Sequence, residues 1–173
     1  MSQEPSTALE FATDRHGSQM YGELPYMTGH LVYVAVLVKS AGYPELEDAA
    51  WLHDIVEDTV TTLQEVEERF GVETAGLVWA VTSEPGKNRK ERNTATYPKI
   101  LQIGDKAIAL KLCDRICNVE ECWRVRDAKL FMYQKEYRGF RGALRSESSD
   151  PRVLKLWDRL DKLLGRYEPQ VKG

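Results

Sequence analysis

The sequence predicts an all-α fold in a single domain over residues 1–173, and three observations support this prediction. A chain of 173 residues and 19.8 kDa suits one domain with a substantial core. Apolar residues make up 42% of the chain and recur at helical spacing in successive segments. No two segments are joined by the turn residues typical of a β-hairpin.

Helical signals in the first half of the chain centre on two segments. Pro44 precedes Glu45–Asp58, where apolar side chains recur three and four residues apart, so one helix is expected there. Thr62 and Glu65 have the spacing of a capping box that opens a short helix, and Gly71 is expected to end it.

Three further helices are expected in the second half, over Ile103–Trp123, Leu130–Leu144 and Val153–Leu164. The polar stretch Ser146–Pro151 separates the last two of them. The segment Leu31–Val38 is ambiguous, because its β-branched side chains suit a buried strand as well as a helix. Periodicity alone does not decide between these two structures.

The motif-bearing part of the expected domain covers about residues 8–121, and the C-terminal helices cover about residues 128–165. The ends before about Thr7 and after about Arg166 are expected to be ragged. The longest apolar run, Leu31–Val38, has eight residues and is too short to cross a membrane. Because the N-terminus also lacks a signal-peptide pattern, we expect a cytoplasmic protein with no membrane partner.

Charge and cysteine content narrow the function further. A net charge of −3 argues against a dedicated nucleic-acid-binding protein. Residues 45–73 hold ten acidic side chains and one base, whereas residues 87–99 hold five bases and one acid. This asymmetry fits a cation site beside an anion-binding loop, although two differently charged solvated faces give the same pattern. Cys113, Cys117 and Cys122 match neither a redox pair nor a zinc ribbon and are expected to be reduced thiols.

The hexapeptide His53–Asp58, with the sequence HDIVED, is the most specific feature of the chain. Random order would produce this spacing of His, Asp and Glu-Asp roughly 0.001 times. On one helix, His53 and Glu57 would be neighbours, as would Asp54 and Asp58. Burying three carboxylates and an imidazole together is costly unless a cation neutralises them, so the hexapeptide predicts a metal site.

One imidazole and one carboxylate do not hold a divalent ion firmly, so other ligands are needed. The remaining histidines are His16 and His30, and Asp114 is an isolated acid in an apolar helix with Asn118 one turn later. Taken alone, His30 suits a satisfied core side chain, and Asp114 suits a buried ion pair with Arg115. Their occurrence together with the hexapeptide favours a metal site.

At these residues the chain resembles the HD-domain metal-dependent phosphohydrolases, whose signature is H…HD…D. More narrowly, it resembles the hydrolase domain of the Rel/SpoT stringent-response enzymes and the small alarmone hydrolases. The resemblance is strong at HDIVEDT (His53–Thr59) and KLCDRICN (Lys111–Asn118) and runs from about Ala8 to about Glu121. It implies a manganese-dependent pyrophosphohydrolase that removes the 3′-diphosphate of (p)ppGpp and gives GDP or GTP and pyrophosphate.

The resemblance also implies roles for individual residues. The metal ligands would be His30, His53, Asp54 and Asp114, and mixed nitrogen and oxygen ligation of this kind suits iron or zinc as well as manganese. Glu57 and Asp58 would orient or deprotonate a water activated by the cation. The nucleotide would be contacted by Asn118, by Lys87 and Arg89 in the expected loop Pro85–Lys90, and by Arg15. A solvated basic turn is the alternative interpretation of that loop.

Two regions depart from the family pattern. An Arg-Lys pair usually precedes Gly-Glu-Pro-Tyr in the alarmone hydrolases, whereas this chain has QMYGELPY (Gln19–Tyr26), with no basic pair and one inserted residue. The C-terminal third has no counterpart that aligns, and amphipathic packing explains its aromatic residues at least as well as a second nucleotide wall. These departures leave the substrate open.

Three functions therefore stay in view. The first is the alarmone pyrophosphohydrolase; the second is a relative that cleaves a nucleoside monophosphate, a deoxynucleoside triphosphate or NADPH on the same metal site. The third is an HD module without activity that binds a nucleotide or a protein, although the presence of both Glu57 and Asp58 speaks against it. The expected partner is a small-molecule nucleotide, with no nucleic acid, and a homo-oligomer is possible.

Overall fold

The structure is a computed structural model that describes residues 7–165, so the expected ragged ends lie outside the described residues. Helices dominate it, and the all-α prediction is confirmed. The α-helices are α1 (Ala8–His16), α2 (Val32–Ser40), α3 (Glu47–Leu52), α4 (Ile55–Asp58), α5 (Leu63–Val81), α6 (Arg89–Ile103), α7 (Asp105–Val125), α8 (Lys129–Leu144) and α9 (Pro151–Leu164). A π-helix, η1, covers Met27–Leu31, and short 3₁₀ turns cover Pro44–Leu46 and Arg145–Glu147.

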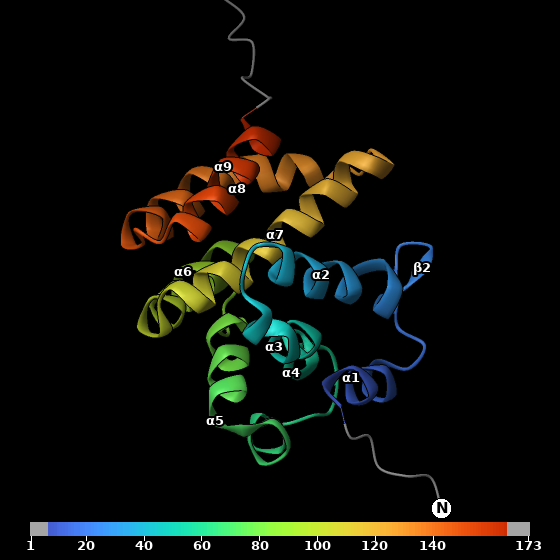
Figure 1. Ribbon diagram of the computed structural model, residues 1–173. Coiled ribbons are helices and arrows are strands. Elements are labelled where there is room, and N and C mark those ends of the chain that lie inside the picture. Colours follow the sequence, from blue (N-terminus) through green and yellow to red (C-terminus); the bar gives the residue numbers. More distant parts are fainter. Residues whose placement is uncertain (1–6, 166–173) are drawn as a thin grey trace, which may run out of the picture.

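Helix α7 is the centre of the packing. It contacts α2, α5, α6, α8 and α9, and its apolar face, including Ile108, Leu112, Ile116 and Val119, is buried. In Figure 1, α8 and α9 lie on one side of α7, and α1 to α5 lie on the other. No helix among the described residues combines the length and apolar character that a membrane crossing needs.

The expected continuous helix over Glu45–Asp58 is broken, and this prediction is corrected. Residues 44–46 form a 3₁₀ turn, α3 ends at Leu52, and α4 begins at Ile55. His53 Nδ1 donates a hydrogen bond to the Ala50 carbonyl oxygen at 2.8 Å. In a continuous helix this oxygen would accept the hydrogen bond of the Asp54 amide. The metal-motif residues therefore sit at a turn between two short helices rather than along one helix face.

A two-residue hairpin, which the sequence did not predict, precedes the π-helix. Strands β1 (Met20–Tyr21) and β2 (Leu24–Pro25) pair antiparallel. Gly22 has a φ of +60° at the first position of the turn, where a type II′ turn requires glycine. Strands of two residues are too short to carry an alternating pattern, so sequence periodicity had nothing to detect.

The ambiguous segment Leu31–Val38 is helical. It continues from the π-helix η1 into α2, and its inward side chains include Leu31, Val34 and Val38. Tyr33 and Val36 lie on the opposite face, with 57% and 60% of their surface exposed. A buried stripe with spacing of three and four residues is satisfied only by a helix.

Helix α5 contains the expected cap and the expected glycine break. Thr62 accepts a hydrogen bond from the Glu65 amide, but the reciprocal half of the capping box is replaced, because the Glu65 carboxylate pairs with Arg15. Gly71 adopts φ +85° and ψ 165°, which kinks the chain before the helix resumes. The short predicted helix is therefore the first half of α5.

Helix α6 was not predicted, and the expected basic loop Pro85–Lys90 is shorter than expected. Asn88 caps α6 by accepting a hydrogen bond from the Glu91 amide at 3.0 Å, so Arg89 and Lys90 belong to the first helical turn. Pro98 inside α6 and the low apolar content of this segment concealed the helix in the sequence. The three C-terminal helices start and end within two residues of their predicted bounds.

The two glycines of α5 generate a stability prediction of opposite signs. Gly71→Ala is expected to lower the free energy of unfolding by about 1–3 kcal/mol, because its φ and ψ lie in a region that essentially only glycine adopts. Gly76→Ala, at a helical position where an added Cβ would meet only Ile103 Cδ1, at 3.9 Å, is expected to raise it by up to about 1 kcal/mol. Urea denaturation of both variants measures the two changes in the free energy of unfolding. Equal changes in the two variants would contradict the non-helical backbone conformation of Gly71.

Candidate metal and nucleotide site

Four side chains that are distant in the sequence converge between η1, the turn after α3, and α7. His30 Nε2 lies 3.2 Å from His53 Nε2 and 3.6 Å from Asp54 Oδ2. Asp114 Oδ1 lies 3.5 Å from His30 Nε2 and 3.8 Å from His53 Nε2. Ligand atoms of His30, His53 and Asp54 all lie within 4.8 Å of one another, which suits a single cation. We call these four residues the His-Asp cluster.

The orientation of His53 places its Nε2 in the cluster. Its Nδ1 donates a hydrogen bond to the Ala50 carbonyl at 2.8 Å, so Nε2 faces His30 and carries either the second proton of the charged imidazole or a lone pair for a cation. His30 Nδ1 is buried without a hydrogen-bond partner among the described residues. Two imidazole nitrogens and two carboxylates facing one another at this distance repel unless a proton or a cation lies between them. The donor set of two nitrogens and two carboxylate oxygens suits a divalent transition metal.

Ionisation within the cluster is shifted as expected for mutual pairing. Burial disfavours the charged form of His53, but Asp54 and Asp114 outweigh it and raise the pKa of that imidazole well above its usual value. Burial acts in the opposite direction on Asp114, where Lys111 and both histidines outweigh it and lower the pKa. Interaction with His53, with hydrogen bonds from both imidazoles, likewise lowers the pKa of Asp54 despite its burial.

A surrounding layer of side chains, which the sequence analysis did not assign, fixes the two carboxylates. Tyr26 donates a hydrogen bond to Asp54 Oδ2. Lys111 Nζ lies 3.0 Å from Asp114 Oδ2 and neutralises part of its charge. Lys111 lies in KLCDRICN, where the resemblance to the family is strong, whereas Tyr26 lies in QMYGELPY, where the chain departs from the family pattern. Such partners orient metal ligands and set their basicity.

Asn118, expected to contact the nucleotide, is held by the protein itself. Its amide nitrogen donates to the backbone oxygen of Asp114 at 3.0 Å and also to the carboxylate Oδ1. Tyr21 donates to the Asn118 Oδ1 at 2.8 Å, and its ring stacks on His30 with centroids 5.1 Å apart. The hairpin therefore reaches the metal site through Tyr21.

The acidic pair that follows the cluster is exposed and anchored from two sides. Glu57 Oε1 accepts from the Ser83 amide at 2.7 Å, and Asp58 Oδ2 accepts from Gln19 Nε2 at 2.8 Å. Gln19 in turn contacts His16 Nδ1 at 2.8 Å, so the third histidine stands outside the cluster. Each carboxylate retains an oxygen with no partner among the described residues, available for a water or a substrate group.

The three predicted basic contacts differ in their freedom. Arg15 is held by Glu65 at 2.6 Å. Arg89 is held by Glu136 of α8 at 2.7 Å, so its place is the start of α6 rather than a loop. The Lys87 side chain is exposed and makes no ion pair among the described residues. Only Lys87 is therefore unengaged.

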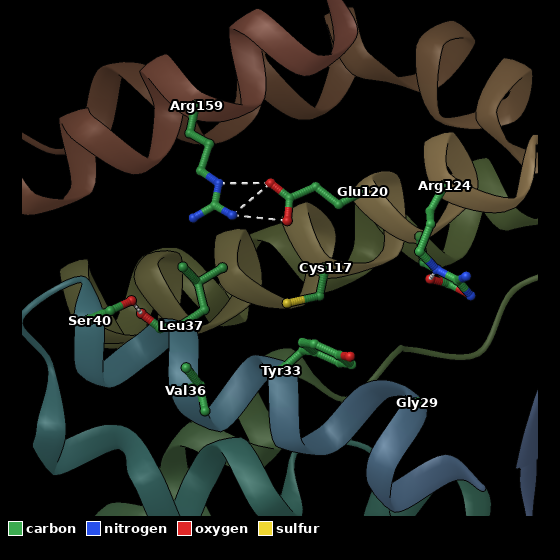
Figure 2. Close-up of a pocket in the computed structure, with 10 residues that line it drawn as sticks. Gly29, Tyr33, Val36, Leu37, Ser40, Cys117, Glu120, Arg124 and Arg159 are labelled. Atoms are coloured by element: carbon green, nitrogen blue, oxygen red, sulfur yellow. Dashed lines mark hydrogen bonds and ion pairs between the residues drawn. The ribbon is translucent and has the colours of Figure 1, made fainter. Parts of the chain in front are cut away.

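Two cavities adjoin α7, and hairpin residues line one of them. One, of about 660 Å³, is lined by Tyr21 and Asn118 next to the cluster and by Tyr133 of α8. The other, of about 390 Å³, lies between α2, α7 and α9, where Cys117, Tyr33 and Val36 line it (Figure 2). The four charged side chains that line this second cavity pair with one another, Glu120 with Arg159 and Glu121 with Arg124. The larger cavity, which opens beside Asp114's partner Asn118, is the better placed for a nucleotide.

Known proteins resemble this chain over the region that contains the His-Asp cluster. The model of the HD domain family matches residues 8–138. A guanosine-3′,5′-bis(diphosphate) 3′-pyrophosphohydrolase of Aquifex aeolicus is 38% identical over 141 residues, which are 78% of this chain and 20% of that protein. The MESH1 enzymes of the same name are 32% identical in Mus musculus, over 66% of each chain, and 30% identical in Xenopus tropicalis, over 72% of this chain and 74% of that one. This chain thus spans one fifth of the length of the first relative, 66% of the mouse protein and 74% of the Xenopus protein.

Solved structures share the fold. A metazoan ortholog of SpoT that hydrolyzes ppGpp superposes with a TM-score of 0.72 at 24% identity and covers 93% of this chain and 98% of that one. The protein lmo0812 from Listeria monocytogenes EGD-e superposes with a TM-score of 0.62 at 23% identity, covering 78% and 95% of the two chains. At this identity the two structures support the arrangement of helices.

The cluster generates a pH-dependent prediction for thermal stability. The raised pKa of His53 means that without metal the folded chain holds a proton more tightly than the unfolded chain, whose imidazole titrates near 6.5. This stabilisation is complete below about pH 6.5 and is lost as pH rises through the folded pKa. A divalent metal competes with that proton, so the rise in Tm caused by Mn²⁺ over EDTA is expected to be larger at pH 8 than at pH 6.

Two variants make that measurement specific. His53→Gln is expected to abolish the Mn²⁺-dependent rise in Tm, whereas His16→Gln, at the histidine outside the cluster, is expected to keep it. Differential scanning fluorimetry measures the Tm of both variants in Mn²⁺ and in EDTA, at pH 6 and at pH 8. An equal rise at pH 6 and pH 8 would contradict imidazole ligation.

Proposed function

This chain belongs to the HD domain family, and from that premise we propose that it is a metal-dependent pyrophosphohydrolase that removes the 3′-diphosphate of (p)ppGpp. The products would be GDP or GTP and pyrophosphate. The observation that carries the proposal is the convergence of His30, His53, Asp54 and Asp114 around a space suited to one cation. The names of the relatives supply the substrate class.

We propose that the His-Asp cluster holds the divalent cation that an HD hydrolase requires, with Mn²⁺ as the metal. Mixed imidazole and carboxylate ligation is compatible with Mn²⁺ and equally with iron or zinc, so the resemblance to the alarmone hydrolases, rather than the ligand set, supports Mn²⁺. When bound, the cation supplies Lewis acidity to the phosphate oxygens and lowers the pKa of water. Tyr26 and Lys111 keep Asp54 and Asp114 oriented toward it.

Glu57 and Asp58 are proposed to accept the proton of the attacking water. Both carboxylates follow the cluster directly, and each keeps one oxygen toward solvent while the Ser83 amide or Gln19 fixes the other. The oxygen of water forms a bond to the phosphorus attached to O3′. The bond between that phosphorus and O3′ breaks, the 3′-oxygen gains a proton, and pyrophosphate leaves.

The nucleoside is proposed to occupy the 660 Å³ cavity beside Asn118. Tyr133 offers an aromatic side chain to this cavity. Asn118 is proposed to have two roles: it lines the cavity wall, and it orients Asp114 through a hydrogen bond to the carboxylate. Lys87 is proposed to contact the diphosphate, with Arg15 and Arg89 joining only if they leave Glu65 and Glu136. We further propose that the chain acts as one domain in the cytoplasm.

A related nucleotide is the alternative substrate, and one observation favours keeping it. The segment Gln19–Tyr26 lacks the Arg-Lys pair that usually precedes Gly-Glu-Pro-Tyr in the alarmone hydrolases, and the hydroxyl of Tyr21 donates a hydrogen bond to Asn118. A pocket built this way has fewer cations for a polyphosphate. Nucleoside monophosphates, deoxynucleoside triphosphates and NADPH therefore belong in the substrate panel.

Substitutions at Asp54 and Glu57 are expected to separate metal binding from water activation. Asp54→Asn is expected to lose both metal and turnover, because it removes a proposed ligand charge. Glu57→Gln is expected to retain metal and lose about 10²–10⁴-fold in kcat, the usual contribution of a general base. Metal content by elemental analysis, with phosphorus products of ppGpp by ³¹P NMR, measures both effects.

The product species tests the proposed substrate. Pyrophosphate from ppGpp supports the proposal, whereas orthophosphate or tripolyphosphate released only from other nucleotides would replace ppGpp by the alternative substrate. Full activity of Glu57→Gln would remove Glu57 from water activation. No turnover of any nucleotide by a metal-loaded chain would leave a binding module.

Lys87 provides a separate prediction about substrate binding. Lys87→Ala is expected to raise KM for ppGpp about tenfold with little change in kcat, because it removes an unengaged cation from the proposed diphosphate contact. Lys155→Ala removes an exposed cation from α9 and serves as the control. Steady-state kinetics give both constants, and an unchanged KM would exclude Lys87 from the site.

A further inference from the structure

A cavity of about 1060 Å³ lies between α6 and α8, and Arg89 is the only one of the proposed substrate contacts that lines it. None of the four cluster residues lines it. The lining from α6 comes from residues 89, 90, 93, 94 and 97, and that from α8 includes residues 132, 135, 136 and 139. These spacings mark one face of each helix, so the cavity is a groove running between two helices that pack together. We call it the α6–α8 groove.

The groove is basic although the chain as a whole is acidic. Arg89, Lys90, Lys135 and Arg138 line it against a single acid, Glu136. Arg89 and Arg115 already neutralise Glu136, at 2.7 Å and 3.3 Å. Lys90, Lys135 and Arg138 make no ion pair among the described residues. Three cations therefore stay uncompensated around one cavity, which favours a ligand with several negative charges.

The remaining lining adds an aromatic ring and a free amide. Tyr97 is half-buried in the groove and packs edge-on against Phe140, which leaves part of its ring to the cavity. The Asn93 carboxamide has no hydrogen bond among the described residues and can both donate and accept. Aromatic faces stack on nucleobases, carboxamides bond to base edges, and Lys and Arg bind phosphates.

The groove is connected to the catalytic side of the protein by one set of contacts. Arg89 and Arg115 lie over the ring of Tyr133, at 5.6 Å and 5.0 Å from its centroid, and both pair with Glu136. Glu136 lines the groove, whereas Tyr133 lines the 660 Å³ cavity beside Asn118. An anion that draws Arg89 from Glu136 would therefore alter the wall of the other cavity.

We propose that the α6–α8 groove is a second binding site, for a phosphorylated nucleotide, that is separate from the His-Asp cluster. The phosphates would lie against Lys90, Lys135 and Arg138, and the base would lie near Tyr97 and Asn93. The proposal goes beyond the proposed hydrolysis, since occupancy of the groove requires neither metal nor turnover. Its ligand regulates the other cavity through the Arg89–Glu136 pair and Tyr133.

The α8 glycines allow a test that leaves the charges of the groove intact. Gly139 lines the groove and Gly142 does not, and a Cβ at either position meets no atom within 4 Å. Both are helical and outside the positive-φ region, so substitution preserves the helix. Gly139→Leu is expected to fill the groove and weaken binding of N-methylanthraniloyl-labelled GDP at least about tenfold, whereas Gly142→Leu leaves binding unchanged. Fluorescence titration of the full chain in EDTA measures both.

Charge and site controls complete the experiment. The double variant Lys135→Glu/Arg138→Glu is expected to weaken the binding of labelled GDP by at least about tenfold. Lys155→Glu makes the same kind of charge change on α9 and is expected to weaken this binding by less than about twofold. His53→Ala is expected to keep binding in EDTA, because the groove excludes the cluster. Melting temperatures confirm that each variant is folded.

Several results would overturn the proposal. Full binding by both groove variants, or loss of binding in His53→Ala alone, would place the nucleotide in the catalytic cavity. Displacement by a polyglutamate peptide at the same concentration as unlabelled GDP would make the groove a site for acidic peptides. None of these results bears on ppGpp hydrolysis, which is read from products in the presence of Mn²⁺.

Discussion

The burial of two imidazoles against two carboxylates is the constraint on which the rest of the structure depends. His30 and His53 are each only 2% exposed, and Asp114 is 8% exposed. Groups of this kind are stable inside a protein only when a cation or shared protons compensate them. The elements that deliver them are correspondingly irregular: a π-helix carries His30, and a broken helix carries His53 and Asp54. Such departures from regular helices are frequent at functional sites.

A regular scaffold holds these irregular elements. Helix α7 brings Asp114 to the site and also packs against α8 and α9, and apolar residues such as Leu112 and Ile116 are buried along it. The same helix carries Arg115, which points to Glu136 of α8. The cluster and the α6–α8 groove are therefore attached to successive residues of one rigid element, so a change at one has a short path to the other.

Helix positions were predictable wherever apolar spacing was strong. The segments of α7, α8 and α9 were located within two residues, because each presents a clear apolar stripe to the core. Helix α6 and the hairpin were not predicted from the sequence. Helix α6 has few apolar residues and contains Pro98, and strands of two residues are too short to show a periodic pattern. The break at His53 escaped as well, because it depends on an imidazole taking a backbone carbonyl rather than on helix propensity.

For the candidate site, the sequence by itself determined which chemistry-bearing residues the chain possesses and predicted a cation at the hexapeptide, because charge and residue type are local properties. The structure buries His53 and leaves Glu57 and Asp58 exposed, so the charge to be compensated is that of the His-Asp cluster rather than of the whole hexapeptide. Only the tertiary structure decided that His30 and Asp114 join His53 while His16 does not, and that Asn118 is bonded to Asp114 and Tyr21. It also decided that Arg15 and Arg89 are ion-paired with Glu65 and Glu136. The physical reason is that contacts between distant segments follow from how whole helices pack, and this is not encoded in the spacing of any one segment.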